Sequence, residues 1–259
     1  MTGQAGRRPA EIPLKTPEQI EIMREGGRIL ARALAAAGEM IEPGVTTAAL
    51  DRRVAEVLRE SGAQASFLGL YGFPASVCVA VNDVVVHGIP HEEVRLRDGD
   101  IIGIDLGVFW GGLHVDGAST YEVGAVGRAV RKLLTTTRTA LNLGIAAARP
   151  GARIRDISRA IQDHVERRRY SCVRALCGHG IGFEVHEAPH VPNFVSREAG
   201  PVIVPGMTLA IEPMVNMGSA DVYTDDDGWA VRATDGKPSA HYEHTVAITE
   251  RGPVVLTVP

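Results

Sequence analysis

Two aspartates near the middle of the chain have surroundings that suggest chemistry. Asp105 ends a mostly apolar run that begins at Gly99, and Asp116 lies eleven residues further on. The run predicts a buried strand, and Trp110-Gly111 predicts a two-residue turn into a second strand. In that register Asp105 directly faces Asp116, at a Cβ separation of about 4.5 to 5.5 Å. Buried carboxylates this close repel each other, so we expect a cation beside them.

This pair alone does not establish a site, because aspartate is mostly exposed and one of the two could cap a turn while the other is solvated. The second half of the chain offers further ligand types. His179 lies in a glycine-rich stretch, Glu212 precedes a proline and Glu243 precedes a histidine. Each has an ordinary alternative as a turn histidine, a strand-end acid or a solvated strand residue. The set of five is far more specific than its members.

Four carboxylates and one imidazole suit hard or borderline divalent metal ions. One M²⁺ would leave such a set over-charged, whereas two would balance its four negative charges. If the five side chains converge, the sequence therefore predicts a dinuclear site. Two metal ions in such a site bridge a water, lower its pKa and clamp the carbonyl during a hydrolysis.

The composition narrows the class of protein. With 259 residues and a formal net charge of −4, the chain can form one domain or two fused halves and gives no sign of a nucleic-acid or membrane surface. It lacks the apolar core of a signal peptide and the roughly 18 apolar residues of a spanning helix. Cys78, Cys172 and Cys177 fit neither a disulfide framework nor a zinc finger. We expect reduced thiols in a soluble cytoplasmic protein.

The elements that must position the acids can be placed from periodicity and from capping residues. Thr16, Pro17 and Gln19 form the N-terminal signature of a long amphipathic helix. The predicted order is a loose arm over residues 1–15, that helix, a second helix from Thr46 or Thr47 to Gly62, strands and turns over residues 65–88, the two aspartate-bearing strands, a helix over residues 129–148, and another helix after Pro150-Gly151.

This order of elements repeats with a constant offset of 107 residues. The offset carries Pro43 onto Pro150 and Asp105 onto Glu212. It also carries one apolar helix face, Leu50, Val54 and Leu58, onto another, Ile157, Ile161 and Val165. Coincidental patterning is the alternative, but a constant offset that links a helix face to an acid-ended strand predicts two similar halves. Their acid-bearing strands would meet across a pseudo-twofold axis.

The ordered motifs resemble those of the methionine aminopeptidases, in their short bacterial type I form. The matching motifs are His87-Gly-Ile-Pro, Asp105, Asp116, Gly178-His179-Gly-Ile-Gly, His186, Ile211-Glu212-Pro213-Met214 and Tyr242-Glu243-His244-Thr. The resemblance runs from about Thr16 to the C-terminus. It implies an α+β pita-bread fold with an internal pseudo-twofold duplication and an antiparallel sheet covered by helices. Residues 16–259 would then form a single metallopeptidase domain made of two similar halves.

The resemblance also implies a role for each candidate ligand. Asp105 would bind one metal ion alone, and Asp116 and Glu243 would bridge two ions. His179 and Glu212 would complete the coordination of the other ion, and Glu212 would take a proton from the water between the metals. The ions would be Mn²⁺, Fe²⁺, Co²⁺ or Zn²⁺, which all accept these ligand types.

Further residues are assigned to substrate binding by the same resemblance. His87 would lie near the scissile nitrogen, and His186 would hydrogen-bond the scissile carbonyl and stabilise the oxyanion. The pocket for a methionine side chain would be lined by Leu70, Phe73, Cys78, His87, Val185 and Trp229. We expect structural roles for the remaining histidines, which are His91, His114, His164, His190, His241 and His244.

The chain departs from the usual pattern around this pocket. Leu70-Tyr71-Gly72-Phe73-Pro74 stands where Tyr-His-Gly-Tyr-Pro is usual, Phe67 takes a position often held by cysteine, and Val185 replaces a larger residue. Gly117-Ala118 follows Asp116 in place of a more common pair. These departures leave the candidate ligands intact. They bear on pocket shape and rate rather than on reaction type.

The implied reaction is removal of the initiator methionine from nascent chains whose second residue is small. The alternatives are an Xaa-Pro aminopeptidase or prolidase, which normally carries a large extra N-terminal domain, and a non-catalytic relative of the fold, which typically loses ligands. A type II enzyme would need a helical insertion for which the interval between His186 and Glu212 leaves no room. The resemblance implies association with the ribosome, and the sequence favours a monomer.

Overall fold

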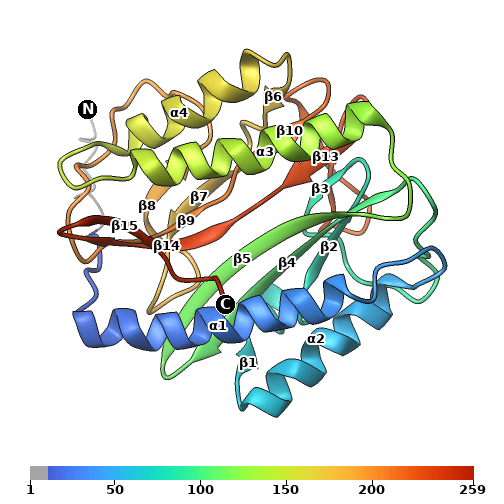
Figure 1. Ribbon diagram of the computed structural model, residues 1–259, viewed down its shortest axis with the longest axis horizontal. Coiled ribbons are helices and arrows are strands. Elements are labelled where there is room, and N and C mark those ends of the chain that lie inside the picture. The colour runs from blue at the N-terminus through green and yellow to red at the C-terminus, as the bar shows by residue number, and fades with distance from the viewer. Residues whose placement is uncertain (1–10) are drawn as a thin grey trace, which may run out of the picture.

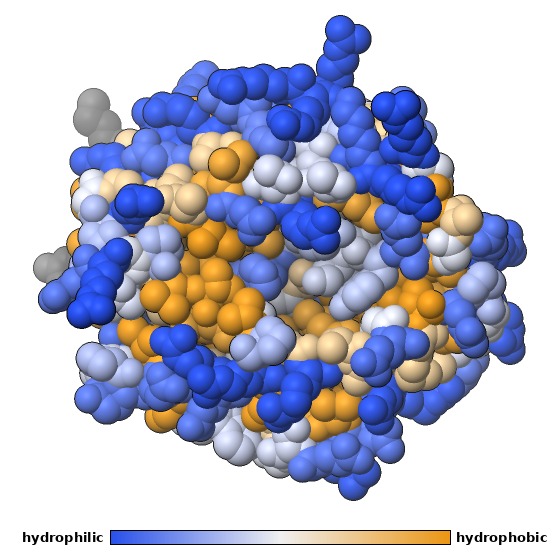
Figure 2. All heavy atoms as spheres, viewed as in Figure 1, coloured by the Kyte–Doolittle hydropathy of each residue, from blue (hydrophilic) through white to orange (hydrophobic). Residues whose placement is uncertain are grey.

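Two pairs of helices cover one side of the β-structure in the computed structural model, which describes residues 11–259 (Figure 1). The first pair is α1 (Pro17–Gly38) and α2 (Thr47–Ser61), and the second is α3 (Arg128–Ala147) and α4 (Ile154–Glu166). In the space-filling view of this face, polar residues cover much of the surface and apolar residues show mainly in the band between the helix pairs (Figure 2). Among the described residues, no helix is long and apolar enough to cross a membrane.

The predicted helix starts in the first half are confirmed. The Thr16 hydroxyl accepts a hydrogen bond from the Gln19 amide at 3.3 Å, and the Gln19 side chain accepts one from the Thr16 amide at 2.9 Å. This reciprocal pair satisfies two of the amides that a helix N-terminus leaves free. Thr46 caps α2, and Gly62 ends it in the left-handed conformation, at a φ of 72°.

All the ladders between named strands are antiparallel. The strands are β1 (Gln64–Ala65), β2 (Cys78–Val81), β3 (Val84–Val86), β4 (Ile101–Trp110), β5 (Leu113–Glu122), β6 (Ser171–Cys172), β7 (Cys177–Gly180), β8 (Glu187–Pro192), β9 (Thr208–Ile211), β10 (Met214–Asn216), β11 (Val222–Thr224), β12 (Val231–Ala233), β13 (Ser239–His241), β14 (His244–Thr249) and β15 (Gly252–Val255), with a short 3₁₀ helix, η1 (Leu70–Gly72). A first sheet has the order β1-β4-β2 with β5 paired to β4; the others run β13-β10-β6, β11-β12-β3 and β15-β14-β9-β7-β8. Strands under two helix pairs give the α+β, pita-bread architecture that the sequence predicted.

The turn of the β4–β5 hairpin lies one residue later than predicted. Gly111 and Gly112 form it, with φ values of 56° and 86°, and Trp110 pairs with Leu113. A two-residue hairpin turn with positive φ at both positions suits two glycines, whereas a tryptophan there would be strained. Asp105 therefore lies opposite Ala118, and Asp116 lies opposite Gly107. The aspartates are diagonal neighbours on one face of the sheet, not directly opposed residues.

The two halves repeat the same backbone contacts, as the 107-residue offset predicted. The amide of Gly44 bonds the carbonyl of Leu96, and the amide of Gly151 bonds that of Ile203. Each donor and each acceptor in this pair of contacts is related by 107 residues. After Asp105 and Glu212 the offset grows to 125 residues, because the second half holds 18 more residues there, including the β11–β12 hairpin.

The junction of the halves is itself symmetric. The Thr120 hydroxyl donates to the His241 carbonyl at 2.7 Å, and the same hydroxyl accepts from the His241 amide at 3.0 Å. The Thr245 hydroxyl makes the same two contacts with Asp116, each at 2.8 Å. The 125-residue offset relates Thr120 to Thr245 and Asp116 to His241. A pseudo-twofold axis therefore passes between β5 and the segment that joins β13 to β14.

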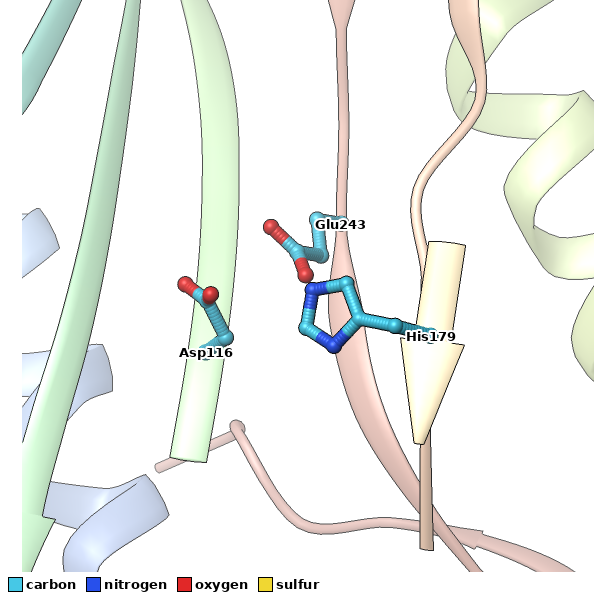
Figure 3. A group of neighbouring side chains, drawn as sticks. All are labelled: Asp116, His179 and Glu243. Atoms are coloured by element: carbon cyan, nitrogen blue, oxygen red, sulfur yellow. The ribbon is translucent and has the colours of Figure 1, made fainter. Parts of the chain in front are cut away.

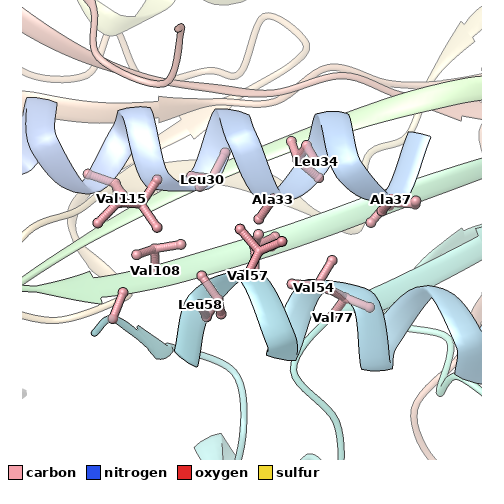
Figure 4. Close-up of a cluster of buried hydrophobic side chains, with 14 of the residues drawn as sticks. Leu30, Ala33, Leu34, Ala37, Val54, Val57, Leu58, Val77, Val108 and Val115 are labelled. Carbon is pink, nitrogen blue, oxygen red and sulfur yellow. The ribbon is translucent and has the colours of Figure 1, made fainter. Parts of the chain in front are cut away.

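Two apolar cores hold these halves under their helices. In the first, Leu30 and Ala33 of α1 and Val54 of α2 pack toward Val108 and Val115 on the hairpin (Figure 4). A second core joins α3 and α4 to β9 and β14. Each fully buried leucine or valine contributes about 1.5 to 3 kcal/mol, so the cores fix the strands on which the acids lie.

The end of the expected N-terminal arm differs from the prediction. Residues 1–10 lie outside the described part of the chain. Lys15, which was placed in a loose arm, is only 4% exposed, and its amide donates to the Gly206 carbonyl at 2.8 Å. The chain is thus anchored to the second half before α1 begins.

Candidate metal centre and active site

The five candidate ligands come from strands of both halves. Asp105 lies within β4, Asp116 within β5 and His179 within β7, while Glu212 directly follows β9 and Glu243 directly precedes β14. All five line one cavity of about 230 Å³. The convergence that the sequence predicted for these residues is therefore present in the structure.

Three of these side chains already form a compact ligand set. Asp116, His179 and Glu243 each offer one ligand atom, and these atoms lie within 4.8 Å of one another. Figure 3 shows the three side chains pointing toward one another from β5, β7 and the segment directly before β14. The Glu212 carboxylate is close by, with Oε1 3.5 Å from Nε2 of His179.

Burial makes the carboxylates unfavourable as free anions. It raises the pKa of Asp116 to about 7, although the Gly117 amide and Asp105 oppose this rise by hydrogen bonding. Burial is also the largest cause of the raised pKa values of Asp105, Glu212 and Glu243, and the charge of Asp116 adds to each. Such a cluster is stable in its ionised form only beside compensating positive charge.

Two oxygen atoms in the cluster have no polar partner among the described residues. Asp105 Oδ1 and Glu243 Oε1 are both buried and accept no hydrogen bond. Buried polar atoms are almost always hydrogen-bonded or bound to an ion. The donor set, its charge and these free acceptors together fit divalent metal ions, for which carboxylate and imidazole are suitable ligands.

His179 is held in the form that a metal ligand needs. Burial, assisted by the charge of His186, lowers its pKa to about 4, so the ring is neutral at pH 7. Its Nδ1 lies 2.9 Å from the Gly180 carbonyl, which can only accept, so the proton is assigned to Nδ1. The lone pair is then on Nε2, the atom that faces the carboxylates.

The two predicted substrate-binding histidines come from different halves of the chain, and both line the cavity. His87 directly follows β3 and adopts a φ of 62°, which is uncommon for a residue with a side chain. His186 packs edge-on against His179, with ring centroids 4.5 Å apart. Burial lowers the pKa of both His87 and His186, so both are neutral near pH 7.

The apolar part of the cavity agrees with the predicted pocket except at one residue. Leu70, Phe73, Cys78 and Trp229 line the cavity, and the rings of Phe73 and Trp229 meet edge to face at 5.1 Å. Val185 does not line it. Its buried side chain packs with Phe73 and Cys78, while the next residue, His186, lines the cavity.

The structure adds lining residues that were not singled out as pocket residues. They are Phe67, Tyr71, Val86, Leu176, Cys177 and Met214. Cys177 lies two residues before His179, and Met214 lies two residues after Glu212. Proximity to the ligand motifs was therefore an available signal. His241, which was expected to be structural, is buried with Nε2 3.8 Å from Glu212 Oε2.

Comparison with known proteins agrees with this geometry. The model of metallopeptidase family M24 matches residues 21–250. A methionine aminopeptidase from Clostridium perfringens is 49% identical over 247 residues, which cover 95% of this chain and 99% of that protein. The crystal structure of a methionine aminopeptidase from Thermotoga maritima matches with a TM-score of 0.94 and 39% identity, covering 96% of this chain and all of that one.

A more distant match bears on the alternative function. The prolidase from Pyrococcus furiosus has a TM-score of 0.78 and 25% identity, covering 95% of this chain but only 65% of the prolidase. The fold is therefore shared, while the prolidase has a further part that this chain does not match. The family model matches most of the chain, and the methionine aminopeptidases above are 39% to 49% identical to it over nearly its whole length. The chain therefore belongs to metallopeptidase family M24, among the methionine aminopeptidases.

Proposed function

We propose that this protein is a metal-dependent aminopeptidase that removes N-terminal methionine from chains whose second residue is small. The observation that carries the proposal is the convergence of four carboxylates, two of them fully buried, and a neutral histidine on one cavity with an apolar wall. The carboxylates supply charge for metal binding, and the wall supplies a site for an apolar side chain. The family match supports the same activity.

The proposed ligand assignment uses two divalent ions. Asp105 would bind one of them, Asp116 and Glu243 would bridge both, and His179 and Glu212 would complete the set. Two M²⁺ ions balance the four carboxylates, whereas a single ion would leave two buried negative charges without compensation. When bound, the ions would lower the pKa of a water and polarise the scissile carbonyl. Mn²⁺, Fe²⁺, Co²⁺ and Zn²⁺ are all compatible with these ligands.

The protein's own groups would carry the proton and orient the substrate. Glu212 is buried with a raised pKa, so its carboxylate is suited to accept a proton from the attacking water and to pass it to the leaving amine. Neutral His186 would donate a hydrogen bond to the scissile carbonyl as negative charge develops there. His87, from the other half, would contact the scissile nitrogen.

The methionine side chain would occupy the apolar wall. Phe73 and Trp229 offer aromatic faces, and sulfur–aromatic contacts favour a thioether. Leu70 and Cys78 complete the surface, and burial raises the pKa of the Cys78 thiol so far that it remains a neutral packing group. An apolar pocket discriminates a methylene by only about 1 to 3 kcal/mol, so we expect some activity on other unbranched side chains.

The proposal extends to nascent chains at the ribosome as the substrate source, to a cytoplasmic location and to a monomeric state. The family resemblance supports the first two, and the lack of a coiled-coil repeat in the sequence supports the third.

A substrate panel tests the proposed function. The purified protein is reconstituted in turn with Mn²⁺, Co²⁺, Fe²⁺ and Zn²⁺ and given Met-Ala-Ser, Met-Gly, Met-Leu and Ala-Pro peptides. We expect release of methionine from the first two, much slower release from Met-Leu and none of alanine from Ala-Pro. Efficient cleavage of Ala-Pro without action on Met-Ala-Ser would instead establish the Xaa-Pro activity. Metal binding without turnover of any peptide would establish a binding protein.

A further inference from the structure

A buried ion pair lies outside the proposed ligand set. Lys15 Nζ pairs with Glu187 Oε2, and the side chains of the two residues are 0% and 4% exposed. Charged side chains are almost never this buried unless they are paired. Burial lowers the pKa of Lys15, and the hydrogen bond and charge of Glu187 oppose that change. The pair joins the segment before α1 to the start of β8, across 172 residues of sequence.

Glu187 also closes the turn that precedes it. Its Oε1 accepts hydrogen bonds from the amides of Phe183 at 2.6 Å and Glu184 at 3.1 Å. One carboxylate therefore holds two backbone amides with one oxygen and the lysine with the other. Without the lysine, this carboxylate would be a buried anion held by amides alone, which is a costly arrangement.

The turn is built around the lysine side chain. Gly182 has a φ of 147°, and a Cβ there would lie 2.2 Å from Lys15 Cε. Lys15 Nζ lies 5.0 Å from the centroid of the Phe183 ring and donates to the Pro13 carbonyl at 3.3 Å. The lysine thus fills the space beside Gly182 and contacts the turn on two sides.

This turn connects two histidines of the site. It follows β7, which carries His179, and it ends at His186, the residue directly before Glu187. Across the ladder, Glu187 pairs with Gly180. From the other half, the His114 amide donates to the Gly182 carbonyl at 2.7 Å. The position of the His186 ring therefore depends on a turn whose two ends are fixed by strands and whose middle is fixed by Glu187.

We propose that Lys15 and Glu187 are positioning residues for His186: the buried pair holds turn 182–187 so that the His186 ring faces the cavity. Neither residue lines the cavity, so neither touches substrate. The inference rests on the proposed function, because it takes His186 as the donor to the scissile carbonyl. A donor displaced by about 1 Å can lose about 100-fold in rate.

The test is a double-mutant cycle that compares Lys15→Met, His186→Ala and the double variant. Lys15→Met keeps the length of the side chain and removes its charge. We expect it to lower kcat on Met-Ala-Ser by about 10- to 100-fold, with little change in KM and in metal content. In the His186→Ala background we expect no further loss, because the donor that Lys15 positions is already absent. Lys15→Arg, which keeps the charge, should recover part of the rate.

The matched control is Arg53→Met. Arg53 also pairs with a glutamate, Glu56, but both side chains are exposed and distant in sequence from the turn. This variant should leave kcat unchanged. Full additivity of Lys15→Met and His186→Ala, or a kcat unaffected by Lys15→Met, would overturn the inference.

Amide hydrogen exchange keeps the two proposals distinguishable. If Lys15→Met folds poorly, Glu187→Leu, which removes both accepting oxygens, takes its place. In either variant the Phe183 and Glu184 amides should exchange faster, while those of β4 and β5 stay protected. Unchanged exchange at Phe183 and Glu184 would overturn the positioning role whatever the kinetics. If exchange rises as expected but His186→Ala retains full kcat, the proposed role of His186 fails instead.

Discussion

The cluster of carboxylates should make the metal-free protein less stable as the pH rises. The pKa of Asp116 is raised from 3.8 to about 7 by burial, so the folded state holds a proton that the unfolded chain has released. Between these two pKa values the folded state binds more protons, and its stability therefore falls with rising pH. The difference of about three pKa units corresponds to about 4 kcal/mol, which is fully lost above pH 7.

Asp116→Asn isolates this contribution. An amide is neutral at every pH, and its Oδ1 can keep the 2.8 Å hydrogen bond that Asp116 Oδ1 accepts from the Gly117 amide. At pH 7.5 the metal-free variant should be more stable than the metal-free parent by up to about 4 kcal/mol. For a chain near this size, that is a rise in Tm of about 8 to 16 °C. At pH 5 the difference should shrink to below about 2 kcal/mol.

Metal ions should reverse the order of the two proteins. Each of the two proposed ions, at 100 times its Kd, would stabilise the folded state by about 2.7 kcal/mol, and the sum of about 5.4 kcal/mol exceeds the advantage of the variant. Saturating Mn²⁺ should raise the Tm of the parent at pH 7.5 and leave that of Asp116→Asn nearly unchanged, because the variant lacks a proposed bridging ligand. Calorimetry of chelator-treated protein between pH 5 and 8, with and without Mn²⁺, measures both effects. Parent stability that increases over this range without metal would refute the electrostatic reasoning.

Three further outcomes are expected. His186→Ala should lower kcat by about 100- to 1000-fold with metal content intact, as measured by peptide turnover and elemental analysis, since an oxyanion donor acts in the transition state; loss of metal would make His186 a ligand. Thr16→Ala should cost about 1 kcal/mol in thermal unfolding through loss of the helix cap, and an unchanged Tm would show the cap to be dispensable. Gly107→Ala should destabilise the folded state by about 1 to 3 kcal/mol, because the added Cβ would lie 2.7 Å from Ser66 Cβ and 2.8 Å from a Phe67 ring carbon. Full stability would mean that the Ser66 and Phe67 side chains move aside without cost.

Features decided by local chemistry could be predicted from the sequence. The Thr16 cap, the end of α2 at Gly62 and the 107-residue repeat each depend on residues whose preferences are strong and short-ranged. The candidate ligands were singled out by their residue types and by the resemblance to a known family, and their role in metal binding stays a prediction.

Features decided by packing between distant segments could not be predicted. The hairpin turn is a different case, because two glycines suit positive φ at both turn positions and the sequence could have indicated Gly111-Gly112. Lys15 looked like part of a polar arm because its partner, Glu187, is 172 residues away. The place of Val185 also depends on packing: it lies in one apolar cluster with Phe73 and Cys78, while His186 lines the cavity itself.

The internal symmetry explains why the site carries four carboxylates and not more. The 107-residue offset relates Asp105 to Glu212, and the 125-residue offset relates Asp116 to His241, whose Nε2 lies 3.8 Å and 4.0 Å from the carboxylates of Glu212 and Glu243. An acid at position 241 in addition to the four that are present would bring the cluster to five negative charges, which exceeds what two divalent ions balance. Burial lowers the pKa of His241 to about 3, so this position is neutral. Position 241 therefore breaks the repeat with a residue that adds no charge to the cluster.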